Sequence, residues 1–66
     1  MKNTIKVERA KLNITQAELA ERVSVSRQTI NSIENGKFNP SVELALKISG
    51  VFNTSVEKIF FLSNEN

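Results

Sequence analysis

A cluster of polar side chains between residues 26 and 35 has the composition of a hydrogen-bonding surface. If this segment is a helix with Ile30 and Ile33 facing inward, at about 100° per residue, the opposite face is rich in donors and acceptors. The side chains of that face belong to Gln28, Asn31, Ser32 and Asn35, with Arg27 on its flank. Arginine can pair with O6 and N7 of guanine, and glutamine or asparagine with N6 and N7 of adenine. Because the face also lacks a carboxylate, it suits the edges of base pairs better than an ordinary solvated surface.

The remaining residue types offer little for catalysis or for metal binding. The chain has no histidine and no cysteine, and all seven of its acidic residues are glutamates. A conventional catalytic triad or cysteine nucleophile cannot be built from this set, and the usual nitrogen and sulfur ligands of zinc are missing. Catalysis by a serine–lysine pair stays formally open, but no serine–lysine spacing stands out in the sequence. We therefore expect no enzymatic activity, no cofactor and no metal.

Two short helices joined by a tight turn are predicted to carry the polar face. Residues 15–18, Thr-Gln-Ala-Glu, have the spacing of a capping box, so a helix begins there and runs to about Val23. After a three-residue turn, Ser26 can cap the next helix, and Gly36 suits the left-handed position beyond its end. Six apolar positions fit the facing sides of the two helices: Leu19, Ala20, Val23, Val25, Ile30 and Ile33. This pattern predicts a helix-turn-helix over residues 16–35, and it favours base readout over a merely polar helix.

The first helix is predicted over residues 4–13, with a charge inside its apolar stripe. Ile5, Arg9 and Leu12 fall at i, i+4 and i+7, on one side of that helix. Glu34 lies near the inner edge of the helix that carries the polar face. We therefore predict that Arg9 and Glu34 pair across the core, because either charge alone would be destabilising there. The alternatives are that Arg9 extends to solvent, or that it reaches a phosphate without Glu34.

The C-terminal half is predicted to add two helices and to complete an all-α fold. Ser41 can cap a fourth helix, whose inward side chains are Leu44, Ala45, Ile48 and Phe52. Residues 54–57 repeat the capping-box spacing, so a short fifth helix is expected through Phe60. Residues 60–63 have a second reading, as a short strand that pairs with residues 1–3. We expect one compact domain over all 66 residues.

Composition and charge narrow the class of protein further. No stretch approaches the roughly 20 apolar residues of a membrane span, and no apolar segment follows Met1 to Thr4, so neither a span nor a signal peptide is expected. The pI is about 9.3 and the net charge is +2, which is mild support for a polyanionic partner. The lack of cysteine fits a cytoplasmic protein.

Short motifs along the chain then point to a family. They are Thr-Gln-Ala-Glu-Leu-Ala at 15–20, Val-Ser-Arg-Gln-Thr-Ile at 25–30, Ile-Glu-Asn-Gly-Lys at 33–37, Asn-Pro-Ser at 39–41, Leu-Ala-Leu-Lys-Ile at 44–48 and Val-Glu-Lys-Ile-Phe at 56–60. Together they resemble the Cro/Xre family of phage-repressor-like regulators, and most closely its compact stand-alone members of the cytolysin-repressor type. The resemblance implies a five-helix, lambda-repressor-like DNA-binding domain. It also implies a transcriptional repressor that binds an inverted-repeat DNA operator as a homodimer.

The same resemblance assigns roles to individual residues. Base-reading positions fall on Arg27, Gln28 and Ser32, to which the outward face adds Asn31. Positions that hold the DNA backbone fall on Gln16, Thr29, Asn35 and Lys37. Gln16 lies in the first turn of its helix, where N–H groups attract a phosphate, although it could instead satisfy its own turn. Asn35 and Lys37 could bracket a phosphate beyond the recognition helix.

Two residues depart from the pattern or stay ambiguous. The turn position Ser24 is usually glycine in this family, and serine in a left-handed conformation there would cost about 1–2 kcal/mol. Phe38 is expected to pack over its loop and the start of the fourth helix rather than to stack on a base.

The C-terminal segment, about residues 51–63, is expected to form the dimer. Four successive apolar residues, 59–62, cannot all face one small core, so part of this surface should be exposed in a monomer. The expected interface residues are Val51, Val56, Phe60, Phe61 and Leu62. A monomer whose tail folds back over its core is the alternative. An antitoxin-like module that binds a protein is a further one, disfavoured because few residues follow the last helix. No small-molecule effector is evident.

Overall fold

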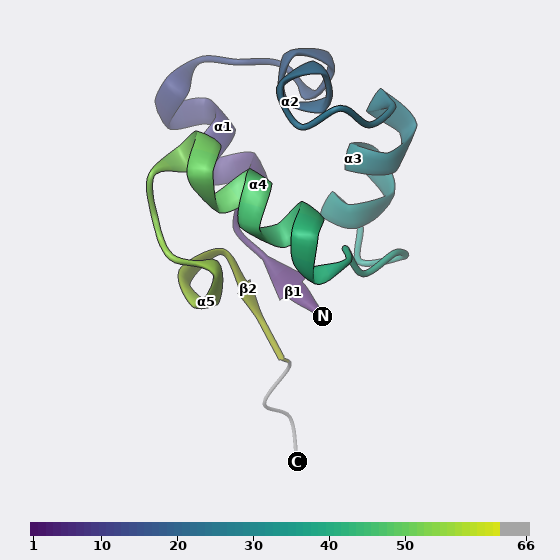
Figure 1. Ribbon diagram of the computed structural model, residues 1–66, viewed down its shortest axis with the longest axis vertical. Helices are drawn as coiled ribbons and strands as arrows, with labels where there is room; N and C mark the ends of the chain where they lie inside the picture. The colour runs from purple at the N-terminus through teal and green to yellow at the C-terminus, as the bar shows by residue number, and fades with distance from the viewer. Residues whose placement is uncertain (63–66) are drawn as a thin grey trace.

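Five helices and a two-stranded sheet form the part of the chain described by the computed structural model, residues 1–62 (Figure 1). In chain order they are β1 (Lys2–Asn3), α1 (Ile5–Leu12), α2 (Gln16–Arg22), α3 (Arg27–Glu34), α4 (Val42–Phe52), α5 (Val56–Ile59) and β2 (Phe60–Phe61). The predicted helical fold is confirmed, and so is the terminal pair of strands. Among these residues no helix is long and apolar enough to cross a membrane.

Side-chain caps fix where most of the helices begin. Thr15 Oγ1 accepts a hydrogen bond from the N–H of Glu18 at 3.0 Å, and Glu18 Oε1 accepts from the N–H of Thr15 at 2.8 Å. This reciprocal pair is the capping box predicted from the sequence. Ser26 and Ser41 each accept from the N–H three residues later, at 3.1 Å, so they start α3 and α4 as predicted.

The fifth helix is shorter than the sequence suggests. Its N-cap is Ser55 rather than Thr54, and the described residues give Ser55 no side-chain cap bond. It ends at Ile59, because Phe60 takes an extended conformation with φ −116° and joins β2. Packing of the buried Ile59 side chain therefore replaces capping as the interaction that holds this single turn.

The core lies between α4 and the other helices, with α4 at the centre of the molecule (Figure 1). The buried apolar residues are Ile5, Ile14, Leu19, Ala20, Val23, Ile30, Ile33, Leu44, Ala45, Ile48, Phe52, Ile59 and Phe60. Leu12, predicted to face inward, is instead 46% exposed. The reason is that α1 ends at Leu12 and Asn13 turns left-handed, with φ 57°, which directs Ile14 into the core in its place.

The two ends of the described chain meet in an antiparallel sheet. Lys2 lies opposite Phe61 and Asn3 opposite Phe60, and the N–H of Thr4 donates to the carbonyl of Ile59 at 2.9 Å. The predicted pairing of residues near 60–63 with residues 1–3 is therefore confirmed for 60–61. Ser63 lies outside the described residues.

Candidate nucleic-acid interface

A left-handed serine sets the angle between α2 and α3. Ser24 has φ 63°, and its N–H donates to the carbonyl of Glu21 at 3.3 Å, while the N–H of Val25 donates to that of Ala20 at 3.0 Å. Ala20 is buried where the two helices approach, so a larger side chain there would push them apart. The turn therefore has the conformation usual for glycine in this position, at a cost in backbone strain.

The outward face of α3 carries the polar residues expected of it. Arg27, Gln28 and Asn35 are exposed, and so is Lys37 just beyond the helix. Half-buried side chains lie between them, on Thr29, Asn31 and Ser32. The carboxylate of α3 belongs to Glu34, whose side chain is only 7% exposed. The exposed face is consequently free of negative charge.

Glu34 is neutralised by an arginine from α1. Arg9 Nε lies 2.7 Å from Glu34 Oε2, and Arg9 Nη2 lies 3.2 Å from Glu34 Oε1, so the guanidinium binds the carboxylate with two parallel bonds. Arg9 Nη1 also donates to the carbonyl of Ile14 at 3.1 Å. The structure thus brings Arg9 and Glu34 together, and the pair ties α1 to the last turn of the polar helix.

Gln16 lies at the centre of a network that the sequence did not predict. Its Nε2 donates to Asn31 Oδ1 at 3.2 Å and to Glu34 Oε1 at 3.1 Å, while its Oε1 accepts from Arg27 Nη1 at 3.2 Å. Gln16 therefore does not satisfy its own turn, as one reading proposed, but bridges α2 to α3. Long-range bonds of this kind leave no local sequence signal, although the polar types at 16, 27 and 31 were already noted. The network positions the Arg27 guanidinium at the start of α3.

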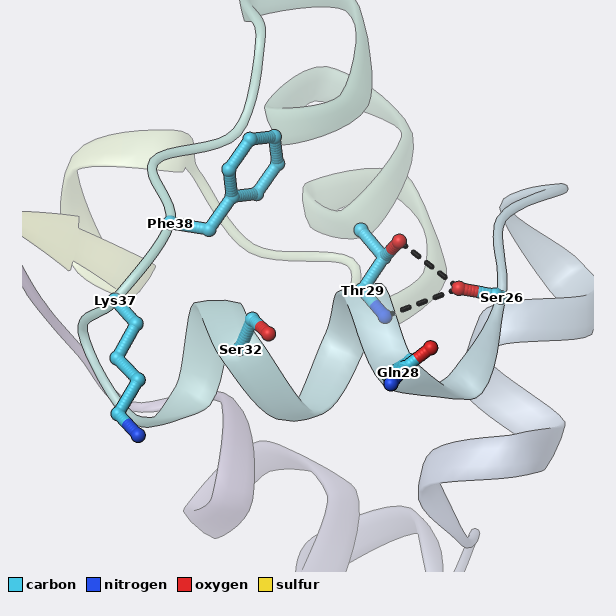
Figure 2. Close-up of a pocket in the computed structure, with 6 residues that line it drawn as sticks. All are labelled: Ser26, Gln28, Thr29, Ser32, Lys37 and Phe38. Carbon is cyan, nitrogen blue, oxygen red and sulfur yellow. Dashed lines mark hydrogen bonds between the residues drawn. The ribbon is translucent and has the colours of Figure 1, made fainter.

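An open hollow of about 410 Å³ lies along α3, beside the loop that follows it (Figure 2). Its lining residues are Ser26, Gln28, Thr29, Ser32, Lys37 and Phe38. The Thr29 hydroxyl lies 3.0 Å from that of Ser26, at the start of the helix. Phe38 was expected to pack over its loop, but 51% of it is exposed and its ring borders the hollow. Sequence reasoning missed this because the packing of a loop residue follows from tertiary structure.

The expected dimer residues divide into two groups. Phe60 is buried, and Val51 and Val56 are half-buried against the core, whereas Phe61 and Leu62 are exposed. An apolar groove of about 300 Å³ lies next to them, lined by Met1, Pro40, Ser41, Val42, Ala45, Leu46, Val56 and Phe60. Val42 and Leu46, both exposed on α4, were not predicted. Their i, i+4 spacing, which places them on one stripe of α4 beside Ala45, was the signal that could have identified them.

Comparison with known proteins gives one consistent result. A helix-turn-helix family model matches residues 5–59. An uncharacterized HTH-type transcriptional regulator from Archaeoglobus fulgidus is 54% identical over 65 residues, which are 98% of this chain and 92% of that protein. A regulator of the same description from Methanocaldococcus jannaschii is 48% identical, with 98% of each chain covered. Another from Bacillus subtilis is 46% identical, with 100% of each chain covered.

Proposed function

We propose, from the premise that this chain belongs to the helix-turn-helix family and is an HTH-type transcriptional regulator, that it is a sequence-specific repressor. In this proposal α3 enters the major groove of double-stranded DNA, and the protein binds an inverted-repeat operator as a homodimer. It acts in the cytoplasm, by covering DNA that the transcription machinery needs. The observation that carries the proposal is the exposed face of α3, which offers donors and acceptors and no carboxylate.

Base reading is assigned to the exposed side of α3. Arg27 and Gln28 have the reach and the donor geometry to address guanine or adenine from the first turn, and Ser32 adds a hydroxyl one turn later. Asn31 belongs to the same set, and its side-chain oxygen accepts a hydrogen bond from Gln16. Because Gln16 also binds Arg27, a change at Gln16 alters the position of two base-reading side chains at once.

Backbone contacts are assigned to residues around the polar face of α3. Gln16 lies in the first turn of α2 and Thr29 in the first turn of α3, where N–H groups and the helix dipole favour a phosphate. Asn35 and Lys37 lie beyond the C-terminal end of α3 and are exposed. Phosphate contacts from these residues would fix the register of α3 in the groove, while the base-reading side chains read the sequence.

The homodimer is proposed on the apolar surface formed by α4, Met1 and the C-terminal strand. Val42 is 78% exposed, Leu46 58%, Phe61 41% and Leu62 80%. Exposed apolar side chains of this kind are characteristic of protein interfaces, and a second copy of the chain would cover them symmetrically. In a two-fold dimer both recognition helices would reach successive major grooves, about 34–36 Å apart.

Selection of binding sites from a random pool of DNA duplexes tests the proposal. We expect the protein to enrich an inverted repeat with half-sites one helical turn apart, and to bind it at least about 10³-fold more tightly than random DNA. A reporter gene with this site over its promoter should lose expression when the protein is present. Failure to enrich any sequence would contradict DNA readout, and a rise in expression would contradict repression alone.

A further inference from the structure

An exposed aromatic ring borders the polar face of α3 and has no part in the hydrogen-bonding readout proposed above. Phe38 lies in the connection between α3 and α4, one residue after the exposed Lys37. Half of its side chain is open to solvent, and it does not belong to the buried core. Packing within the domain therefore does not account for the exposed half of this ring.

The hollow beside the ring has an apolar wall and a polar floor (Figure 2). The Thr29 hydroxyl is 3.0 Å from the Ser26 hydroxyl, which turns it toward the start of the helix. Figure 2 shows the Thr29 methyl group on the side of Phe38, so ring and methyl share one wall. Gln28 and Ser32 supply an amide and a hydroxyl at the floor.

The major groove presents one apolar group that matches such a wall. In a duplex the faces of the bases are covered by their neighbours, so the ring cannot stack on a base as it could on a single strand. The edge of thymine, however, carries a C5-methyl group next to its O4 acceptor, and its adenine partner offers N6 and N7 to a glutamine. A hollow with an apolar wall and a glutamine beside it fits both halves of that base pair.

We propose that Phe38 and the methyl group of Thr29 read the C5-methyl group of one thymine in each half-site, the thymine paired with the adenine that Gln28 addresses. Phe38 is thus a specificity-determining residue outside the recognition helix. This inference rests on the proposed binding of α3 in the major groove. It makes the protein discriminate thymine from cytosine at one position through an apolar contact.

The experiment uses a duplex selected by the wild-type protein from a random pool, resynthesised with single thymines replaced by deoxyuridine. Deoxyuridine pairs as thymine does and lacks only the C5-methyl group. We expect one position per half-site at which this replacement weakens wild-type binding about fourfold, the effect of one buried methyl group. The Phe38→Ala variant should bind the thymine duplex more weakly than the wild type does, and its affinity should not change when that thymine is replaced by deoxyuridine. The Phe38→Leu variant should retain part of the wild-type sensitivity to the replacement.

Val7→Ala is the matched control, because Val7 is 54% exposed on α1, away from the hollow. This variant should respond to deoxyuridine as the wild type does, and thermal unfolding should show that all variants are folded. Equal weakening of thymine and deoxyuridine duplexes by Phe38→Ala would overturn the inference, since it would place the ring on the sugar-phosphate backbone. The inference would also be overturned if the selected site contained no thymine and its binding were still weakened by Phe38→Ala. Only failure to select a site at all would count against the proposed function itself.

Discussion

Asn3 holds the end of α3: its Nδ2 donates to the main-chain carbonyl of Ile33, 2.9 Å away. Its Oδ1 accepts from the N–H of Ile5 at 3.1 Å, so one side chain joins β1, α1 and α3. We expect Asn3→Ala to lower the free energy of unfolding by about 1–2 kcal/mol, the value of two such bonds. Urea unfolding measures this. Asn39→Ala, at an exposed loop position, is the control, and an equal loss there would show that Asn3 has no special role.

The pair between Arg9 and Glu34 should be strongly coupled in stability. Replacing either residue by alanine leaves a nearly buried charge without its partner, which typically costs about 3–5 kcal/mol. In a double-mutant cycle the second substitution should therefore cost much less than the first. The exposed pair of Glu43 and Lys47, 3.5 Å apart on α4, provides a matched cycle with an expected coupling of about 0.3–0.5 kcal/mol. Additive losses for Arg9 and Glu34 would refute the prediction.

Ser24→Gly should stabilise the protein. Glycine adopts the observed φ of 63° without the steric penalty of a side chain, so we expect a gain of about 1 kcal/mol. For a domain of this size that gain corresponds to a rise in Tm of about 4–8 °C, measured by calorimetry. Ser24→Ala retains the strained conformation and should give no such gain. A glycine variant no more stable than wild type would mean that the serine makes compensating interactions.

Substitutions at the proposed base-reading residues should lower affinity for one DNA sequence, whereas a substitution at a proposed backbone-contacting residue should lower affinity for all sequences. Arg27→Ala and Gln28→Ala should each weaken binding to the selected operator by about 1–3 kcal/mol and affect random DNA little. Lys37→Ala should weaken both, and should reduce the dependence of binding on salt by about one phosphate contact. Titrations at several salt concentrations provide the comparison. If the Arg27 or Gln28 variants lost the same affinity for operator and for random DNA, the assignment of these residues to base reading would be wrong.

The apolar surface should control the oligomeric state. Leu46→Glu and Phe61→Glu place a charge in the proposed interface, so each should convert a dimer into a monomer at micromolar concentration. Val7→Glu puts the same charge on an exposed apolar position of α1 and should leave the dimer intact. Sedimentation velocity distinguishes the species. A monomeric wild-type protein would end the proposal, and so would glutamate variants that still dimerise.

Local signals account for most of what the sequence predicted correctly. A capping serine or threonine acts on an N–H three residues away, which is why the starts of α2, α3 and α4 could be placed. The left-handed strain at Ser24 was expected from the family resemblance, in which this turn position is usually glycine. The apolar run at residues 59–62 has more members than one helix face can direct into the core, so exposed apolar side chains could be predicted at this end of the domain.

The features that escaped prediction depend on contacts between distant residues. Gln16 reaches Asn31 and Glu34 across fifteen and eighteen positions, and no periodicity reports such bonds. Leu12 was assigned to the core because the helical period was extended to a residue at which the helix already ends. The exposure of Phe38 depends on where the loop after α3 lies relative to α4. The candidate site was therefore predictable in its residue types, but its geometry was not.

The pairing of β1 with β2 has a consequence for how the protein is made. Of the described elements β1 leaves the ribosome first and β2 last, so Asn3 has no strand to pair with until Phe60 has been synthesised. The contacts between α2 and α3 are local in sequence, and a nascent chain can form them much earlier. Closing the sheet also requires the entropy loss of joining ends almost the whole domain apart. In a growing chain the contacts between β1 and β2, next to the bond from Asn3 to the end of α3, are therefore the last of those described to become available.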